Sequence, residues 1–185
     1  MTLDIDDHAR ARQINVLVII DTAYVKYAYG KNENISQPRH IAREGQFMVS
    51  TGSSAIIHAQ ETGELQLPLE IGDRVAIRVT SLCGNTSDAV IPYRVRRLWG
   101  TRVFAPFEHV FLARDGAVQP DPDSPTHNGL PPLARPTHFS NFDSTVIAHG
   151  TERFEIVFAL YVLSSNGQCQ DPFGYYAWNP TISIV

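Results

Sequence analysis

Three short polar segments carry the side chains in this sequence that are best suited to bind a ligand. They lie at the expected ends of strands, and they are residues 21–24, 84–88 and 175–179. Asn and Asp oxygens beside an aromatic face are what a shallow sugar site needs, sometimes together with a hard cation such as Ca²⁺. The candidate ligand-binding residues are therefore Asp21, Asn85, Asp88 and Trp178. The alternative is that the polar groups form Asx turns and that Trp178 belongs to the edge of the core.

Other site chemistries lack their residue patterns. A blue-copper site needs a Cys followed by His and usually Met, but neither follows Cys169. The seven His show no zinc-ligand spacing, so we predict no metal and no cofactor. The sequence contains no G-x-S-x-G elbow and no Gly-rich phosphate loop that leads into a helix. We predict no catalytic residues, and an enzyme is the weakest of our three functional hypotheses.

A short basic run raises the question of nucleic-acid binding. It holds Arg94, Arg96 and Arg97, followed by Trp99 and Arg102. On a strand Arg94 and Arg96 share one face, which is typical of an ordinary solvated surface. The formal net charge of −4 gives no global attraction for a polyanion. We therefore predict neither nucleic acid nor a membrane as partner.

The cellular location follows from the apolar segments and the cysteines. The first dozen residues are polar, and the apolar run from Ile14 to Ile20 lacks a small-residue cleavage site. The longest apolar stretch elsewhere, Ile156 to Leu163, is far shorter than the ~20 residues of a spanning helix. We expect a cytoplasmic protein without signal peptide or transmembrane segment. Cys83 and Cys169 then favour two reduced thiols, although a single disulfide stays open if their strands are neighbours.

The elements that must position these side chains are strands. Gln13 to Ile20 and Arg153 to Leu163 are almost continuously apolar, so we predict them as central strands covered on both faces. Glu64 to Leu69 and Val75 to Val79 alternate around a Gly72-Asp73 turn, which predicts a hairpin. Further candidate strands are Phe47 to Ser50, Ala55 to Ala59, Ala89 to Val95, Val110 to Ala113, Thr145 to Ala148 and Tyr175 to Val185.

These strands, with no sustained helical stripe, predict an all-β fold. We expect a two-sheet antiparallel β-sandwich with jelly-roll-like or Greek-key connections and little helix. Residues 1–12 would form a flexible N-terminal head and residues 13–185 a single domain. Residues 119–136 hold six of the twelve prolines and predict a long loop, either a functional contact or a passive surface excursion.

Three stretches of the chain resemble a known family. They are Ile14 to Thr22, which ends in Asp-Thr, Leu67 to Val79 with its Gly-Asp turn, and Gly84 to Tyr93. They resemble the inclusion-body protein family of Gram-negative bacteria, the PixA/AidA family, over most of the chain from Ile14 onward. The Pro-rich loop and the acidic head have no match in that pattern. The resemblance implies an abundant protein of host-associated bacteria, in some members stored as cytoplasmic inclusions and in others under quorum-sensing control. It carries over no catalytic residue.

The sequence thus leads to a primary and a second hypothesis. The first is a non-enzymatic accumulation protein that associates with itself as a dimer or larger homo-oligomer and has a role in host interaction. The second is a lectin-like carbohydrate-binding module that uses the four candidate residues. Paired strand edges would support the first, and convergence of the candidate residues in one concave patch would support the second.

Overall fold

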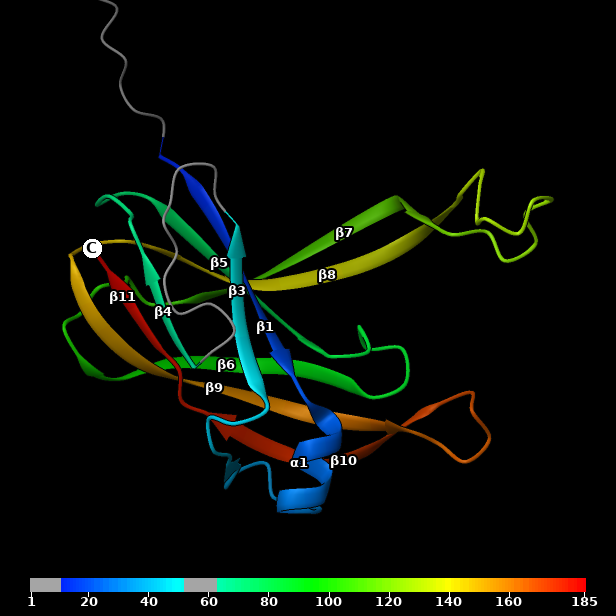
Figure 1. Ribbon diagram of the computed structural model, residues 1–185, viewed down its shortest axis with the longest axis horizontal. Helices are drawn as coiled ribbons and strands as arrows, with labels where there is room; N and C mark the ends of the chain where they lie inside the picture. The colour runs from blue at the N-terminus through cyan, green and yellow to red at the C-terminus, as the bar shows by residue number, and fades with distance from the viewer. Residues whose placement is uncertain (1–10, 52–62) are drawn as a thin grey trace, which may run out of the picture.

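The chain folds into two packed β-sheets with one short helix (Figure 1). A computed structural model describes residues 11–51 and 63–185. One sheet has the strand order β3-β1-β5-β8-β7, and the other has the order β2-β10-β9-β11-β4 with β6 paired to the free side of β9. The strands are β1 (Gln13–Ile20), β2 (Arg39–His40), β3 (Gln46–Thr51), β4 (Glu64–Leu67), β5 (Arg74–Ser81), β6 (Ala89–Gly100), β7 (Glu108–Gln119), β8 (Leu133–Thr145), β9 (Gly150–Leu163), β10 (Gln170–Trp178) and β11 (Thr181–Ile184). The predicted all-β sandwich with little helix is confirmed.

The sheets are mixed, which corrects the prediction of purely antiparallel pairing. β1 runs parallel to β5, β4 parallel to β11, and β2 parallel to β10. The remaining strand pairs are antiparallel. Alternating apolar residues show that a segment is a strand, but they do not fix the direction of its neighbour.

The predicted hairpin around Gly72-Asp73 is wrong, although both of its strands exist. β4 pairs with β11 in one sheet, whereas β5 pairs with β1 and β8 in the other. The turn therefore carries the chain from one sheet to the other. Gly72 has a φ of 99°, a conformation that residues with a side chain rarely adopt. The predicted strand from Ala55 to Ala59 lies outside the described residues.

The two strands predicted as central each have neighbours on both sides. On β1 the even-numbered residues from Ile14 to Ile20 are buried, while Gln13 and Asn15 on the opposite face are exposed. The expectation that β1 is covered on both faces is therefore wrong, because the residues of its outer face are exposed or only half-buried, Leu17 and Ile19 included. On β9 every residue from Phe154 to Ala159 is buried, as expected of a strand covered on both sides.

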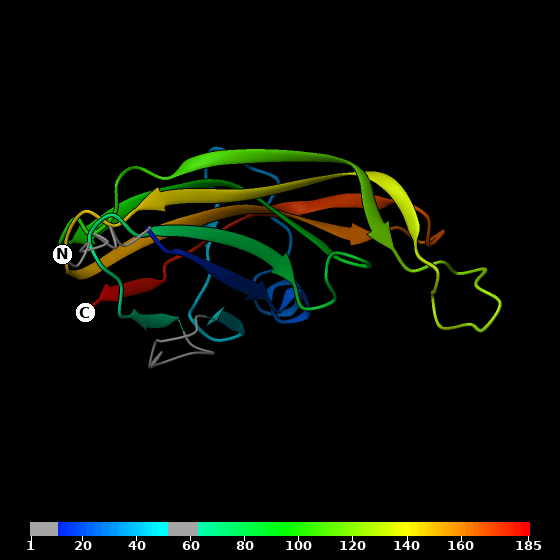
Figure 2. The ribbon, with the colours of Figure 1, turned by 90° about the horizontal axis from the view of Figure 1, so that it is seen from above.

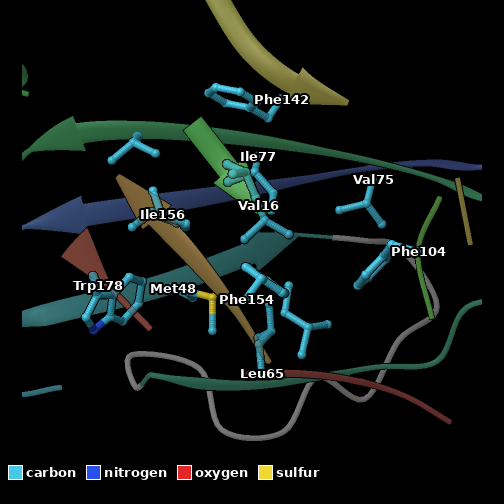
Figure 3. Close-up of a cluster of buried hydrophobic side chains, with 14 of the residues drawn as sticks. Val16, Met48, Leu65, Val75, Ile77, Phe104, Phe142, Phe154, Ile156 and Trp178 are labelled. Atoms are coloured by element: carbon cyan, nitrogen blue, oxygen red, sulfur yellow. The ribbon is translucent and has the colours of Figure 1, made fainter. Parts of the chain in front are cut away.

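The space between the sheets is filled by large side chains from both of them (Figure 3). Val16, Met48 and Ile77 of one sheet face Phe154 and Trp178 of the other. Trp178, Tyr176 and Phe158 have no exposed surface. Burial of so many apolar groups is the main driving force for folding, and no disulfide bridges the described chain.

The β7–β8 hairpin extends beyond the rest of the domain as an arm (Figures 1 and 2). The predicted 119–136 loop is shorter than expected, because β7 continues to Gln119 and β8 already begins at Leu133. Pro136 lies inside β8, where proline removes one ladder donor but leaves the strand intact. Only the segment between the two strands is a true loop.

Arg12, which the sequence assigned to a flexible head, is anchored to the turn before β5. Its main-chain N–H donates to Asp73 Oδ1 at 2.8 Å, and its guanidinium forms an ion pair with Asp73 Oδ2 at 2.7 Å. Residues 1–10 of the predicted head lie outside the described residues. Within residues 11–51 and 63–185, no helix is long and apolar enough to cross a lipid bilayer.

The two tryptophans allow a matched test of this core. Trp178→Ala should lower the free energy of unfolding by about 3–5 kcal/mol, because it removes a fully buried ring from between the sheets. Trp99→Ala, the control, removes a ring that is 55% exposed on β6 and should cost about 1 kcal/mol or less. Urea denaturation followed by circular dichroism measures both. Equal losses for the two variants would contradict the assigned core.

Candidate functional site

The parallel pairing of β1 with β5 brings two of the polar segments together. Ile20 lies opposite Ser81 in this register, so the residues that follow the two strands are neighbours. Helix α1 (Thr22–Tyr29) begins directly after β1, and a tight loop follows β5. Thr22 Oγ1 donates to Asp88 Oδ2 at 2.8 Å, and Lys26 Nζ donates to the same oxygen at 2.6 Å.

Asp21 caps the helix that the sequence analysis missed. Its carboxylate accepts a hydrogen bond from the Tyr24 main-chain N–H at 3.0 Å, as an N-cap residue does. Its own N–H donates to Gly45 O at 2.8 Å. The helical spacing of apolar residues is recognisable only over a segment longer than the 8 residues of α1, so the sequence pattern did not reveal this helix. An Asp directly before a helix-compatible segment was the available signal.

Asn85 organises the loop after β5. Its side-chain oxygen accepts from the main-chain N–H groups of Ser81 and Val90, both at 3.0 Å. Its φ of 63° lies in the left-handed region, which Asn tolerates better than most residues. This is the Asx-type turn that the alternative interpretation anticipated.

Trp178 does not belong to this cluster, which corrects its assignment as a candidate ligand-binding residue. It has no exposed surface and lies between the sheets (Figure 3). A ring that contacts no solvent cannot stack on a sugar. Asp21, Asn85 and Asp88 do lie near one another, but they already hold protein partners. Their role in ligand binding stays a prediction.

Cys83 lies in the same loop, with an exposed thiol. The hydrogen bond with the Ser81 hydroxyl, whose oxygen lies 3.2 Å from Sγ, is the main cause that lowers the pKa of Cys83 to about 6. Burial opposes this change, and the main-chain groups of Ser87 and Asp88 add to it. Cys83 and Cys169 are not bonded to each other, in line with the favoured prediction of two free thiols.

Three arginines of the basic run, Arg94, Arg96 and Arg97, lie on β6. Two of them, Arg94 and Arg96, form ion pairs with a buried acid that sequence analysis did not single out. Glu155 on β9 is almost fully buried, and Arg96 Nε donates to its Oε2 at 2.7 Å. Arg94 adds a second ion pair at 3.4 Å, and His40 Nε2 lies 3.7 Å from the other oxygen. A buried carboxylate needs such partners to remain charged. Arg94 and Arg96 are thus committed within the protein.

A groove of about 680 Å³ opens on the outer face of the five-stranded sheet. It is lined by side chains from all five strands, although the sequence analysis did not predict it. The polar lining residues are Gln13, Asn15, Arg74, Arg78, Asn141 and Asp143. The apolar lining residues include Leu17, Val49, Ala76, Val110 and Leu112. The sequence signal for this groove was a small residue, Ala76, between two long ones, Arg74 and Arg78, on the same face of β5.

The groove is a suitable size for a small ligand but has no metal-binding cluster. Pockets that bind small molecules usually measure 300–1,000 Å³. Nowhere in the part of the chain that the structure describes do three or more His, Cys, Asp or Glu side chains gather as metal ligands. The chemistry available in the groove is therefore hydrogen bonding, apolar contact and ion pairing.

The ionisation of Cys83 can be tested by alkylation. In a Cys169→Ser variant, the rate of reaction with iodoacetamide should rise with pH and reach half its plateau near pH 6, because the thiolate is the nucleophile. A Cys83→Ser variant should lose the phase with this midpoint. Mass spectrometry of quenched samples measures the rates. A midpoint at pH 8 or above in the first variant would contradict the hydrogen-bonded thiolate.

Comparison with known proteins agrees with the family resemblance seen in the sequence. A crystal structure of an inclusion body protein (PixA) from Burkholderia cenocepacia J2315 is 27% identical, with a TM-score of 0.75 and full coverage of both chains. A cysteine protease inhibitor from Entamoeba histolytica is 11% identical, covers 66% of this chain and 84% of its own, and has a TM-score of only 0.28. No curated protein matches the chain. The family model PixA, described as inclusion body protein, matches residues 12–184, and the chain belongs to this family.

Proposed function

We propose that this protein is a non-enzymatic accumulation protein whose partner is a second copy of itself. The description of its family as inclusion body proteins supports storage as dense cytoplasmic particles. The resemblance found in the sequence adds quorum-sensing control and a role in host interaction to the proposal. Dense accumulation requires surfaces through which copies associate.

The observation that carries the proposal is the free edge of β7. β7 is the last strand of its sheet and pairs only with β8, so its outer N–H and C=O groups have no strand partner in the described chain. Phe111 is 72% exposed and Val118 is 71% exposed on this strand. An edge with exposed apolar side chains is a template for pairing with another chain.

A β-bulge places these two side chains on the same face of the arm. Arg114 lies opposite Thr137 and Ala117 opposite Arg135, so β7 has one extra residue between them. Phe111 lies opposite Ser140, and Val118 lies opposite Ala134. Those two partners are an even number of residues apart on β8 and thus share a face. Phe111 and Val118 therefore project from the same face of the arm at two positions about 20 Å apart. This face is called the apolar surface of the arm.

The sequence around the bulge is complementary to itself. Antiparallel pairing of two β7 strands about a two-fold axis through the bulge sets Phe111 opposite Val118 of the second copy. The same register sets Arg114 opposite Asp115 of the second copy. Apolar pairs and pairs of opposite charge that face each other across two strands are stabilising. Like charges that face each other are destabilising, so a register that brings them together is disfavoured. The charged pair therefore favours one register over its alternatives.

Removal of the apolar surface should abolish association. The wild-type protein should be at least a dimer by light scattering, whereas Phe111→Asp/Val118→Asp should be a monomer with unchanged circular dichroism. Ile71→Asp is the matched control, because Ile71 is 62% exposed but lies in the turn between the sheets. A monomeric wild-type protein at high concentration, or a dimeric double variant, would contradict the proposal.

A charge exchange tests the register. Arg114→Asp sets two acidic residues against each other in both halves of the interface, so it should weaken dimerisation at least several-fold. Arg114→Asp/Asp115→Arg restores opposite charges and should recover wild-type affinity. Sedimentation velocity across a dilution series measures the dissociation constants. Equal weakening in the single and double variants would show that these residues do not face each other.

A further inference from the structure

The outer groove of the five-stranded sheet owes its depth to one small residue. Ala76 lies at the centre of the sheet, opposite Asn15 on β1 and Asp143 on β8. On the same strand it is flanked by Arg74 and Arg78, whose long side chains rise on either side of it. The result is a hollow with a cation at each end.

The two arginines differ in the residues that they contact within the protein. Arg74 Nη2 lies 3.2 Å from Asp143 Oδ2, so one end of the groove is neutralised. The Arg78 guanidinium lies over the Phe139 ring, 5.7 Å from its centroid, and has no carboxylate partner within residues 11–51 and 63–185. The ring holds Arg78 in place without neutralising it. The charged lining residues therefore carry a net charge of +1, located at the Arg78 end.

Amide groups line the floor between the two ends. Asn141 is only 8% exposed, and its Nδ2 donates to Asp143 Oδ1. This bond uses the amide nitrogen, and within residues 11–51 and 63–185 no group donates to the Asn141 side-chain oxygen, so that oxygen can accept from a ligand. The side chains of Gln13 and Asn15 are exposed beside it. Amides both donate and accept, as hydroxyl groups do, so the floor suits a ligand with several hydroxyls.

Apolar side chains form the two long walls. Leu17 and Val49 lie opposite each other in the β1–β3 register, and Val110 and Leu112 line the other side from β7. Such surfaces pack against the C–H face of a sugar ring. A purely apolar ligand would leave the amides and Arg78 unpaired, which is costly. A highly charged ligand would exceed the single free cation.

We propose that this groove binds an acidic saccharide, a sugar that carries one carboxylate per unit. Arg78 pairs with the carboxylate in a two-pronged contact, Asn15 and Asn141 hydrogen-bond to ring hydroxyls, and the apolar walls contact the ring. This carbohydrate site is separate from the one expected at Asp21, Asn85 and Asp88. It also does not depend on self-association, because Val110 and Leu112 face away from the surface formed by Phe111 and Val118.

Isothermal titration calorimetry with defined probes tests the site. The acidic probes, each with one carboxylate, are galacturonate, a hyaluronan disaccharide and 3′-sialyllactose. Their neutral counterparts are galacturonate methyl ester, N,N′-diacetylchitobiose and lactose. At least one acidic probe should bind, and its neutral counterpart should bind at least ten-fold more weakly. Added salt should weaken the acidic interaction. Failure of all three acidic probes, or equal affinity for the neutral counterparts, would overturn the proposal.

Variants locate the binding to the groove. Arg78→Met keeps the apolar stem but removes the cation, and it should weaken binding of the acidic probe at least ten-fold. Ala76→Leu fills the hollow and should abolish binding, with folding checked by the melting temperature. Arg135→Met, the control, changes an exposed Arg on the arm and should leave affinity unchanged. Light scattering on each variant separates this result from self-association, since none alters Phe111 or Val118. Wild-type affinity in Arg78→Met would refute the site.

Discussion

The parallel pairing of β1 with β5 is the constraint on which the arrangement of this protein depends. Its register is fixed at one end by Arg12, whose main chain and side chain both bind Asp73 next to the start of β5. Arg74 N–H also donates to Arg12 O at 2.8 Å. Burial alone would raise the pKa of Asp73, but its hydrogen bonds with Arg12 and Glu70 lower it, so the carboxylate stays charged. The contacts between Arg12 and Asp73 thus set which residue of β1 lies opposite which residue of β5.

Two polar regions of the molecule, the cluster at the start of α1 and the outer groove, are consequences of that register. At the far end, Ile20 opposite Ser81 brings the start of α1 against the loop that holds Asp88 and Cys83. In the middle, Asn15 opposite Ala76 sets a polar side chain beside the hollow of the outer groove. If β5 moved by one residue relative to β1, Ala76 would face the core and Ile77 the outer face. Ile77 would then fill the groove, and the core would lose a large apolar side chain.

The sequence predicted what depends on local pattern and failed where distant segments decide. Alternation and turn residues predicted most of the strands, the two central strands and the β-sandwich, but they missed β2 and nearly all of β8. They could not show that the Gly72 turn joins different sheets, because β4 finds its partner in β11 near the other end of the chain. Nor could they show that Trp178 is enclosed, because the face of β10 that packs against the other sheet is decided by its pairing with β9 and by the packing of the two sheets. Asp21 and Asn85 fit the alternative interpretation as cap and turn residues, while the predicted role of Asp21, Asn85 and Asp88 in ligand binding stays a prediction. The groove could not be predicted because five strands must assemble to form it.

The position of β11 also affects how the chain can fold. β11 lies between β9 and β4, and within the described residues β4 pairs with β11 alone. The buried Leu65 and Leu67 of β4 therefore cannot be enclosed in the sheet until residues 181–184 have left the ribosome. Contacts between such distant segments form slowly, because the entropy of closing the loop is lost before they stabilise the fold. Incomplete chains therefore expose an unpaired apolar strand during synthesis, which favours misassembly of unfinished chains.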